Sequence, residues 1–177
     1  MKQKHKIIFF IAFILAVVSW MTAAYYWDKL PAFIPVHFGI DGLPNGWADK
    51  SLFNVFLMPV IQTLMLAGFA FLYHKPQYSN IPTTMWLMAL GKKQRDNAFD
   101  MIRIMLTGTV LFISVLFAYI TYEMNASAFD AKSGLSTWAM LALLGLMMIW
   151  LGYWTYRVYK ATKKAVSKTK LKRGVKK

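Results

Sequence analysis

Residues 28–50, DKLPAFIPVHFGIDGLPNGWADK, decide how this 177-residue chain is organised, because they separate two long apolar runs, 7–27 and 52–73. The stretch holds three of the six prolines in the chain. Proline fixes φ and favours extended neighbours, whereas Asp-Gly and Asn-Gly pairs are typical of turns. We therefore expect a compact cap of short extended pieces, with turns at Asp41-Gly42 and Asn45-Gly46, folded over the helix ends.

Two further apolar runs, 104–122 and 138–156, complete a set of four uncharged segments of 19 to 22 residues. About 20 residues in a helix are needed to cross the hydrocarbon layer of a membrane. The chain is also 58% hydrophobic, which in a short chain is typical of a membrane protein. The sequence predicts an all-α integral membrane protein, a four-transmembrane-helix bundle over residues 1–160 with an ordered loop between its first two helices.

The basic residues predict the orientation of this bundle. Of the 21 Lys and Arg residues, 18 precede the first run, lie in the 74–103 loop or follow the fourth run. The positive-inside rule then places the helices in the plasma membrane with both termini in the cytoplasm and the 28–51 cap outside the cell. In an alternative interpretation the first run is a signal peptide cleaved near Ala24. The aromatic cluster 25–27 that follows is instead typical of a helix anchored at the interface.

Polar and small residues within the runs predict how the helices pack. Asn54 and Gln62 flank Pro59 in the second run, and we expect both amides to hydrogen-bond neighbouring helices. In the third and fourth runs, small or weakly polar residues recur on one face, which is typical of close helix packing or of docking to a protein partner. These residues are Thr107, Leu111, Ser114, Ala118 and Thr121, followed by Ala142, Gly145 and Gly152. A polar permeation path along the third run is the alternative.

Two segments on the cytoplasmic side carry weaker signals. Residues 81–91 are apolar, begin near Pro82 and end at Gly91, and are too short to span. We expect a short helix at the inner interface. The lysine-rich tail 161–177 is interpreted as a topology signal held near anionic lipids. It has no aromatic residue to stack on bases, so nucleic acid is not expected as a partner.

The chemistry within the apolar runs argues against transport driven by ions or protons. No ionisable side chain lies in the middle of any run, whereas pumps and coupled carriers keep such groups there. The chain also has no cysteine, so the cap cannot be held by disulfides. We predict no cofactor and no metal for this protein.

His37 is the one imidazole in the cap, and three roles remain open for it. It could bond a backbone carbonyl or an aspartate and lock the cap. It could bind a metal with two of the carboxylates of Asp28, Asp41 and Asp49. It could also act with one Asp in acid–base catalysis. Lys50 is expected to meet a headgroup phosphate or Asp49.

The cap resembles a bacterial membrane family of unknown function. The resemblance is carried by a pattern of the form LPxxIPxHFxxxGxPxGWxxK, placed directly after a first spanning helix. Its residues here are Leu30, Pro31, Ile34, Pro35, His37, Phe38, Gly42, Pro44, Gly46, Trp47 and Lys50. Together with Asp41, they are the candidate ligand-binding residues.

The same module resembles the N-terminal part of SdpI-type immunity proteins, which protect a cell against a secreted toxic peptide. In the best-known system, the immunity protein also recruits a transcriptional repressor. The resemblance implies a non-enzymatic membrane protein that gives immunity to, or senses, a peptide toxin or a lipid headgroup at the outer face. Two alternatives are a metal- or His/Asp-dependent membrane enzyme or lipid-handling protein, and a structural subunit of a membrane complex.

Overall fold

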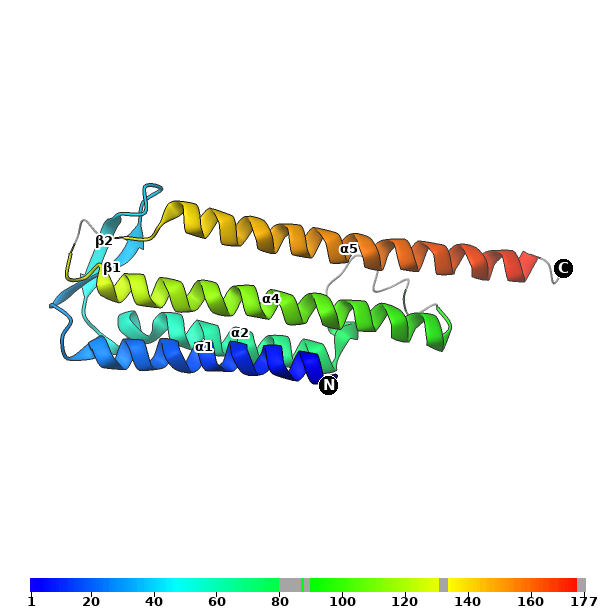
Figure 1. Ribbon diagram of the computed structural model, residues 1–177, viewed down its shortest axis with the longest axis horizontal. Coiled ribbons are helices and arrows are strands. Elements are labelled where there is room, and N and C mark those ends of the chain that lie inside the picture. Colours follow the sequence, from blue (N-terminus) through cyan, green and yellow to red (C-terminus); the bar gives the residue numbers. More distant parts are fainter. Residues whose placement is uncertain (80–86, 88–89, 131–133, 175–177) are drawn as a thin grey trace.

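Long helices and one β-hairpin make up the computed structural model (Figure 1), which describes residues 1–79, 87, 90–130 and 134–174, with side chains as far as residue 164. In chain order the elements are α1 (Gln3–Trp27), β1 (Phe33–Phe38), β2 (Pro44–Asp49), α2 (Leu52–His74), the 3-10 helix η1 (Pro76–Tyr78), α4 (Lys92–Ala126) and α5 (Thr137–Gly174). The fold is therefore mostly helical. The first loop forms a two-stranded antiparallel sheet, so the all-α class is wrong there, whereas the short extended pieces predicted for this loop are confirmed.

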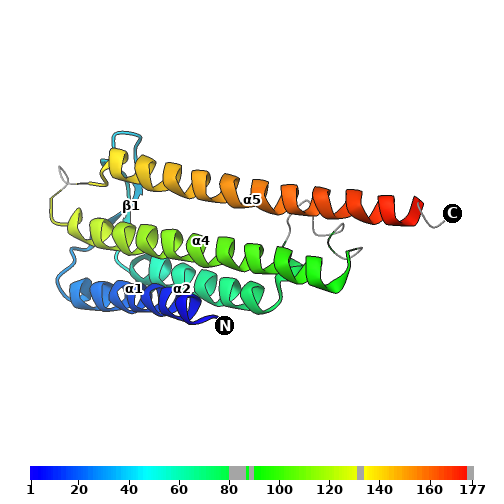
Figure 2. The same ribbon diagram turned by 45° about the vertical axis from the view of Figure 1, so that its right-hand side comes forward.

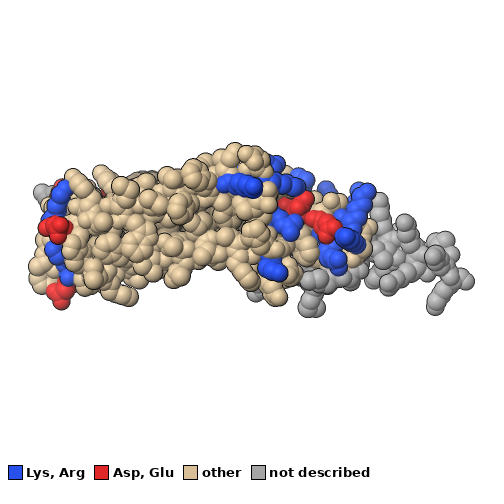
Figure 3. Space-filling model, turned by 90° about the horizontal axis from the view of Figure 1, so that it is seen from below, with Lys and Arg blue, Asp and Glu red and all other residues tan. Residues whose placement is uncertain are grey.

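α1, α2, α4 and α5 are each long and apolar enough to cross a membrane. The helices are longer than the apolar runs that predict them, because α4 begins at Lys92 and α5 continues through the basic segment to Gly174. At 1.5 Å per residue, the 35 residues of α4 extend over about 50 Å, beyond a hydrocarbon layer of roughly 30 Å. On the face shown in Figure 3, charged side chains gather at the two ends and leave the middle uncharged.

The helices form two unequal parts around α4. Figures 1 and 2 show α1 and α2 on one side of α4 and α5 alone on its other side. The hairpin lies at one end of the bundle, which we call the hairpin end. The N-terminal start of α1 and the C-terminal part of α5 lie toward the opposite end, which we call the basic end.

The small-residue face of α4 is used inside the chain. Thr107, Ser114 and Thr121 are buried, whereas Leu111 and Ala118 are half-buried. The hydroxyls of Thr107 and Thr121 donate to carbonyls four residues earlier in the same helix, at 2.6 and 2.8 Å. These hydroxyls are satisfied locally, so they support packing of the face rather than the alternative of a polar path.

The prediction for the two amides of α2 is confirmed for one and wrong for the other. Buried Gln62 donates its Nε2 hydrogen to the Ser114 carbonyl of α4 at 3.1 Å. Asn54 instead donates to the Asp49 carbonyl at 2.8 Å, and its backbone N–H donates to the Ser51 hydroxyl, the N-cap of α2. Asn54 therefore fixes the junction between hairpin and helix, because position 54 lies in the first turn.

α5 is held to α4 through one large aromatic residue in its middle. The Trp150 indole lies against Gly108 and donates its Nε1 hydrogen to the Met105 carbonyl at 3.0 Å. A Cβ at Gly108 would lie 2.3 Å from the indole ring, so only glycine permits this approach. The small-residue face of α5 is exposed, and nothing in the described chain lies within 4 Å of a Cβ added at Gly145 or Gly152. It consists of Ala142, Gly145 and Gly152.

The predicted interface helix at 81–91 lies outside the described residues, apart from Leu87, Leu90 and Gly91. Leu87 and Leu90 are buried and pack with Ile102 of α4 and Val158 of α5. This cluster joins α4 and α5 at the basic end. The two helices are thus connected at Trp150 and again at Val158, about two turns further along α5.

Candidate functional site

The candidate site is built on the hairpin, whose two strands pair from Phe33–Asp49 at the base to Phe38–Pro44 near the tip. The register is irregular on both sides of His37, which pairs with Gly46 and leaves Val36 and Asn45 without opposite partners. Such bulges bend a strand and redirect its side chains, and they are common next to functional sites. Here they bring the side chains of His37 and Asn45 into contact.

The turn of the hairpin depends on Asp41 and Gly42. Gly42 has a φ of 81°, in the left-handed region that glycine adopts without strain. The Asp41 carboxylate accepts a hydrogen bond from the Leu43 N–H at 3.1 Å, and the Gly39 N–H donates to the Leu43 carbonyl at 2.8 Å. The predicted turn at Asp41-Gly42 is therefore confirmed.

The predicted turn at Asn45-Gly46 is wrong, because both residues lie within β2. Gly46 is required there for a different reason. A Cβ at this position would lie 2.8 Å from the Cβ of His37 on the opposite strand. The glycine thus allows His37 to lie close over β2, where its ring reaches Asn45.

The base of the hairpin is fixed by burial of apolar side chains. Leu30 and Ile34 are buried in a cluster with Ala23 of α1 and Val55 of α2. Burying a side chain of this size contributes about 1.5–3 kcal/mol. These two positions of the LPxxIPxHFxxxGxPxGWxxK pattern therefore hold the hairpin on the helix ends and are inaccessible to a ligand.

Lys50 also has a structural role, which differs from the predicted contact with a phosphate or Asp49. Its Nζ donates to the carbonyls of Trp27 and Leu30, at 3.3 and 3.1 Å, and lies 5.5 Å from the centre of the Trp27 ring. The last carbonyls of a helix have no partner within the helix and carry partial negative charge. A lysine at this point neutralises the end of α1.

The tip of the hairpin docks on the connection that leads into α5. The Leu135 N–H donates to the Gly42 carbonyl at 2.9 Å, and the Thr137 hydroxyl donates to the Ile40 carbonyl at 3.1 Å. A Cβ at Gly42 would lie 1.9 Å from the Leu135 carbonyl oxygen, and one at Gly134 would lie 2.2 Å from the Gly42 carbonyl oxygen. Two glycines thus permit backbone-to-backbone contact. The hairpin therefore connects the ends of α1 and α2 to the start of α5.

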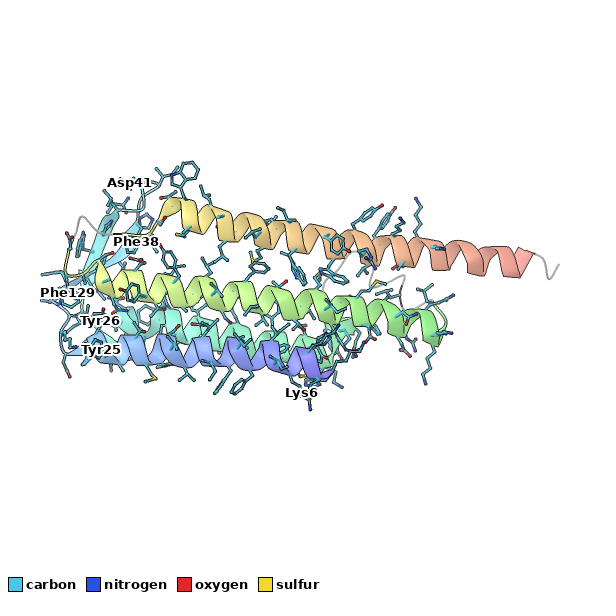
Figure 4. All side chains as sticks on the ribbon, viewed as in Figure 1. Lys6, Tyr25, Tyr26, Phe38, Asp41 and Phe129 are labelled. Carbon is cyan, nitrogen blue, oxygen red and sulfur yellow. The ribbon has the colours of Figure 1, made fainter. Side chains whose placement is uncertain are left out.

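A cavity of about 330 Å³ lies between the hairpin and the first turns of α5. Figure 4 shows Phe38 and Asp41 toward the hairpin tip, close to the start of α5. Most of the residues that line the cavity are apolar, with His37 and Thr137 as its main polar side chains. The apolar lining is Val36, Phe38, Ile40, Leu135, Met140, Leu141 and Leu144. A cavity of this size and character suits an apolar group with one polar contact.

The imidazole of His37 is exposed, and its Nδ1 hydrogen-bonds the Asn45 side-chain oxygen. An amide oxygen only accepts hydrogen bonds, so the His37 Nδ1 carries the hydrogen. In the neutral ring, Nε2 is then an acceptor, and no described residue occupies it. The partner of His37 is the side-chain amide of Asn45, so the predicted bond to a backbone carbonyl or an aspartate is wrong.

The carboxylates near His37 in sequence do not meet it in space. Asp49 lies at the base of the hairpin opposite Phe33, and Asp41 bonds the backbone of its own turn. Among the described residues, no group of three His, Asp or Glu side chains lies close enough to hold a metal ion. The arrangement therefore offers neither a His/Asp pair nor a set of metal ligands.

The remaining positions of the pattern divide between structure and surface. Pro35 is buried and pairs with Trp47, whose indole is 43% exposed. Pro31 is exposed just before the hairpin, and Pro44 begins β2. His37, Phe38 and Trp47 are the aromatic positions of the pattern that keep an accessible face. The sequence does not predict the cavity wall that α5 supplies, because nothing in residues 134–144 indicates a contact with the hairpin.

Comparison with known proteins gives one result for this region. Residues 7–63 match a family described as a domain of unknown function, DUF1648. No curated protein matches the chain, and no solved structure matches it. The matched region covers α1 from residue 7, the whole hairpin and the first half of α2. It ends before α4 and α5, so the matched region supplies the hairpin side of the cavity and not its α5 side.

Proposed function

We propose that this protein is a non-enzymatic membrane protein that binds an apolar side chain of a membrane-active peptide in the cavity between the hairpin and α5. Immunity to that peptide, or sensing of it, is the outcome. The observation that carries the proposal is the cavity itself, apolar on both walls and bordered by His37. The resemblance of the cap to the SdpI-type module supports the choice of a peptide.

The position of the cavity supports a ligand that arrives along the membrane. The distribution of Lys and Arg predicts that the hairpin end lies outside the cell. The cavity would then sit at the outer interface, at the level of the first turns of α5. Membrane-active peptides concentrate at this depth, because their apolar faces insert beside the headgroups.

The size of the cavity limits what part of a peptide it accepts. A volume of about 330 Å³ is at the lower end for small-molecule sites, and it fits one or two apolar side chains. Burial of each such side chain contributes about 1.5–3 kcal/mol. The Nε2 of His37 would accept a hydrogen bond from an N–H of the peptide and so fix its orientation.

The test is survival of cells that lack the gene and carry either the wild-type protein or a variant, exposed to a panel of membrane-active peptides. Leu144→Trp fills the cavity, and we expect it to sensitise cells as deletion does. Leu146→Trp is the matched control, because Leu146 is 56% exposed on α5 and does not line the cavity. Equal survival of the two variants, at equal protein levels in the membrane, would refute the proposal.

A docking function for α5 is a second candidate, favoured by one observation. Gly145 and Gly152 have nothing within 4 Å of an added Cβ, whereas the corresponding face of α4 is buried within the chain. In lipid, helices associate through such small residues. We propose that any protein partner would contact α5 rather than α4, and co-purification with Gly145→Leu in mild detergent tests this.

A further inference from the structure

A second cavity of about 330 Å³ lies at the basic end, far from the hairpin. Three elements line it. Met1 and Lys2 precede α1, Tyr73 and His74 end α2, and Asp100 and Arg103 come from α4. Its walls therefore carry two permanent cations, one carboxylate and one imidazole. Figure 3 shows basic and acidic side chains gathered at this end of the molecule.

The charges in this cavity do not cancel. The Lys2 ammonium pairs with one oxygen of Asp100 at 2.8 Å, and the Arg103 guanidinium pairs with the other at 3.1 Å. Two cations thus share one carboxylate, so the group keeps a net positive charge. A cavity of this kind favours an anion, because a second negative charge completes the pairing.

The two cations also keep hydrogen-bond donors that no described residue uses. In the described chain, Lys2 donates one hydrogen bond, to Asp100, and Arg103 donates two, to Asp100 and to the Tyr73 carbonyl. An ammonium has three donors and a guanidinium has five. The side chains are 56% and 29% exposed, respectively, so the unused donors are open to a ligand.

The arginine is held in place before any ligand binds. Its Nε donates to the Tyr73 carbonyl at 3.2 Å, and its Cζ lies 5.9 Å from the centre of the Tyr73 ring. Tyr73 is itself fixed, because its hydroxyl hydrogen-bonds buried His5 of α1 at 2.8 Å. Phe9 packs edge-on against the same ring. A guanidinium oriented in this way loses little entropy on binding.

We propose that this cavity binds a phosphate group, with Arg103 and Lys2 as its donors. A phosphate has several acceptor oxygens in the geometry that a guanidinium fork matches. The predicted topology puts the basic end at the cytoplasmic interface, where the headgroups of anionic phospholipids are abundant. A soluble phosphate would use the same donors, so the experiment must separate the two sources.

The test is native mass spectrometry of the full chain in mild detergent with added phosphatidylglycerol, and with diacylglycerol as the lipid without a phosphate. We expect phosphatidylglycerol to be retained in preference to diacylglycerol. Arg103→Gln should lower this retention about tenfold, as expected for loss of a charged hydrogen-bond donor. Lys160→Gln is the matched control, because it removes one exposed cation from α5 and should leave retention unchanged.

The Asp100→Asn variant distinguishes a specific effect on phosphate binding from a loss of binding caused by misfolding. It removes the carboxylate that competes for both cations, so we expect tighter retention, which an unfolded variant cannot give. Equal losses in Arg103→Gln and Lys160→Gln, or weaker binding by Asp100→Asn, would overturn the proposal. Inorganic phosphate supplies the last comparison. If it displaces the lipid, a soluble phosphate can be the source; if binding depends on Arg103 but resists inorganic phosphate, the source is the lipid.

Discussion

Replacement of Gly42 by alanine tests whether the hairpin is fixed to α5 by its tip. Gly42 has a positive φ, and its added Cβ would lie 1.9 Å from the Leu135 carbonyl oxygen. The left-handed conformation costs an alanine about 1–2 kcal/mol. Loss of the Leu135–Gly42 hydrogen bond adds about 0.5–1.5 kcal/mol. We expect the docked tip to be destabilised by about 1.5–3.5 kcal/mol in total.

The assay is amide hydrogen exchange of the detergent-solubilised protein, read on peptides that contain residues 39–43 and 134–137. A loss of about 2 kcal/mol raises the population of the undocked tip, and hence the exchange rate, roughly 30-fold. Exchange of the α4 peptides serves as an internal reference, because that helix is buried between the others. Gly42→Ala should leave it unchanged.

Two further alanine substitutions separate the cost of the positive φ at Gly42 from the cost of the steric clash with the neighbouring carbonyl oxygen. Gly134→Ala introduces a contact of 2.2 Å with the Gly42 carbonyl oxygen without a positive φ, so it tests the steric term alone. Gly145→Ala introduces neither, since nothing lies within 4 Å, and a glycine-to-alanine change within a helix is expected to stabilise it by about 0.5–1 kcal/mol. If Gly42→Ala exchanged at the same rate as Gly145→Ala, the docked hairpin would be refuted.

Two more predictions concern the attachment of α5 and the end of α1. Gly108→Ala should force Trp150 out of its site and lower the melting temperature of the detergent-solubilised protein. Gly68→Ala is the control and should leave the melting temperature unchanged, because nothing lies within 4 Å of a Cβ added at Gly68. Equal melting temperatures of the two variants would contradict this packing. Lys50→Met should destabilise the junction of α1 and the hairpin by about 1–2 kcal/mol, because the Trp27 carbonyl at the end of α1 and the Leu30 carbonyl beyond it lose a charged donor. Lys29→Met is its control, since Lys29 is exposed and contacts the Tyr25 ring; a larger loss for Lys29→Met in the same melting experiment would refute the role of Lys50.

The sequence predicts the helices well because their signals are local. Uncharged runs near 20 residues identify the four long helices, and the spacing of Thr107, Ser114 and Thr121 identifies the buried face of α4. The helix ends are less well predicted, since the basic segments at 92–103 and 157–174 continue as helix. Charge marks where a helix leaves the hydrocarbon layer, not where the helix itself ends.

The candidate site is less predictable because it depends on contacts across the chain. The turn at Asp41-Gly42 follows from local chemistry, but the pairing of His37 with Gly46 depends on two bulges that no residue pattern announces. Likewise, Lys50 finds its partners 20 and 23 residues away, at Leu30 and Trp27. The α5 wall of the cavity is nearly a hundred residues from the hairpin. Sequence spacing cannot locate such partners.

The structure also divides the LPxxIPxHFxxxGxPxGWxxK pattern into residues that build the hairpin and residues that stay accessible on its surface. Leu30, Ile34 and Lys50 fix the hairpin on the helix ends, and Gly42 fixes its tip. Any chain that keeps this hairpin needs such residues whatever it binds. A pattern rich in structural residues therefore identifies the scaffold better than the ligand.

If the proposed function is correct, the choice of peptide depends on the part of the cavity outside the matched region. The hairpin wall lies within residues 7–63, whereas Leu135, Met140, Leu141 and Leu144 lie beyond it on the α5 side. If the proposed function is correct, proteins with the same hairpin but different residues at these four positions should respond to different peptides. Exchanging residues 134–144 between two such proteins should transfer the response, and exchanging residues 33–49 should not. The reverse result would place specificity in the hairpin.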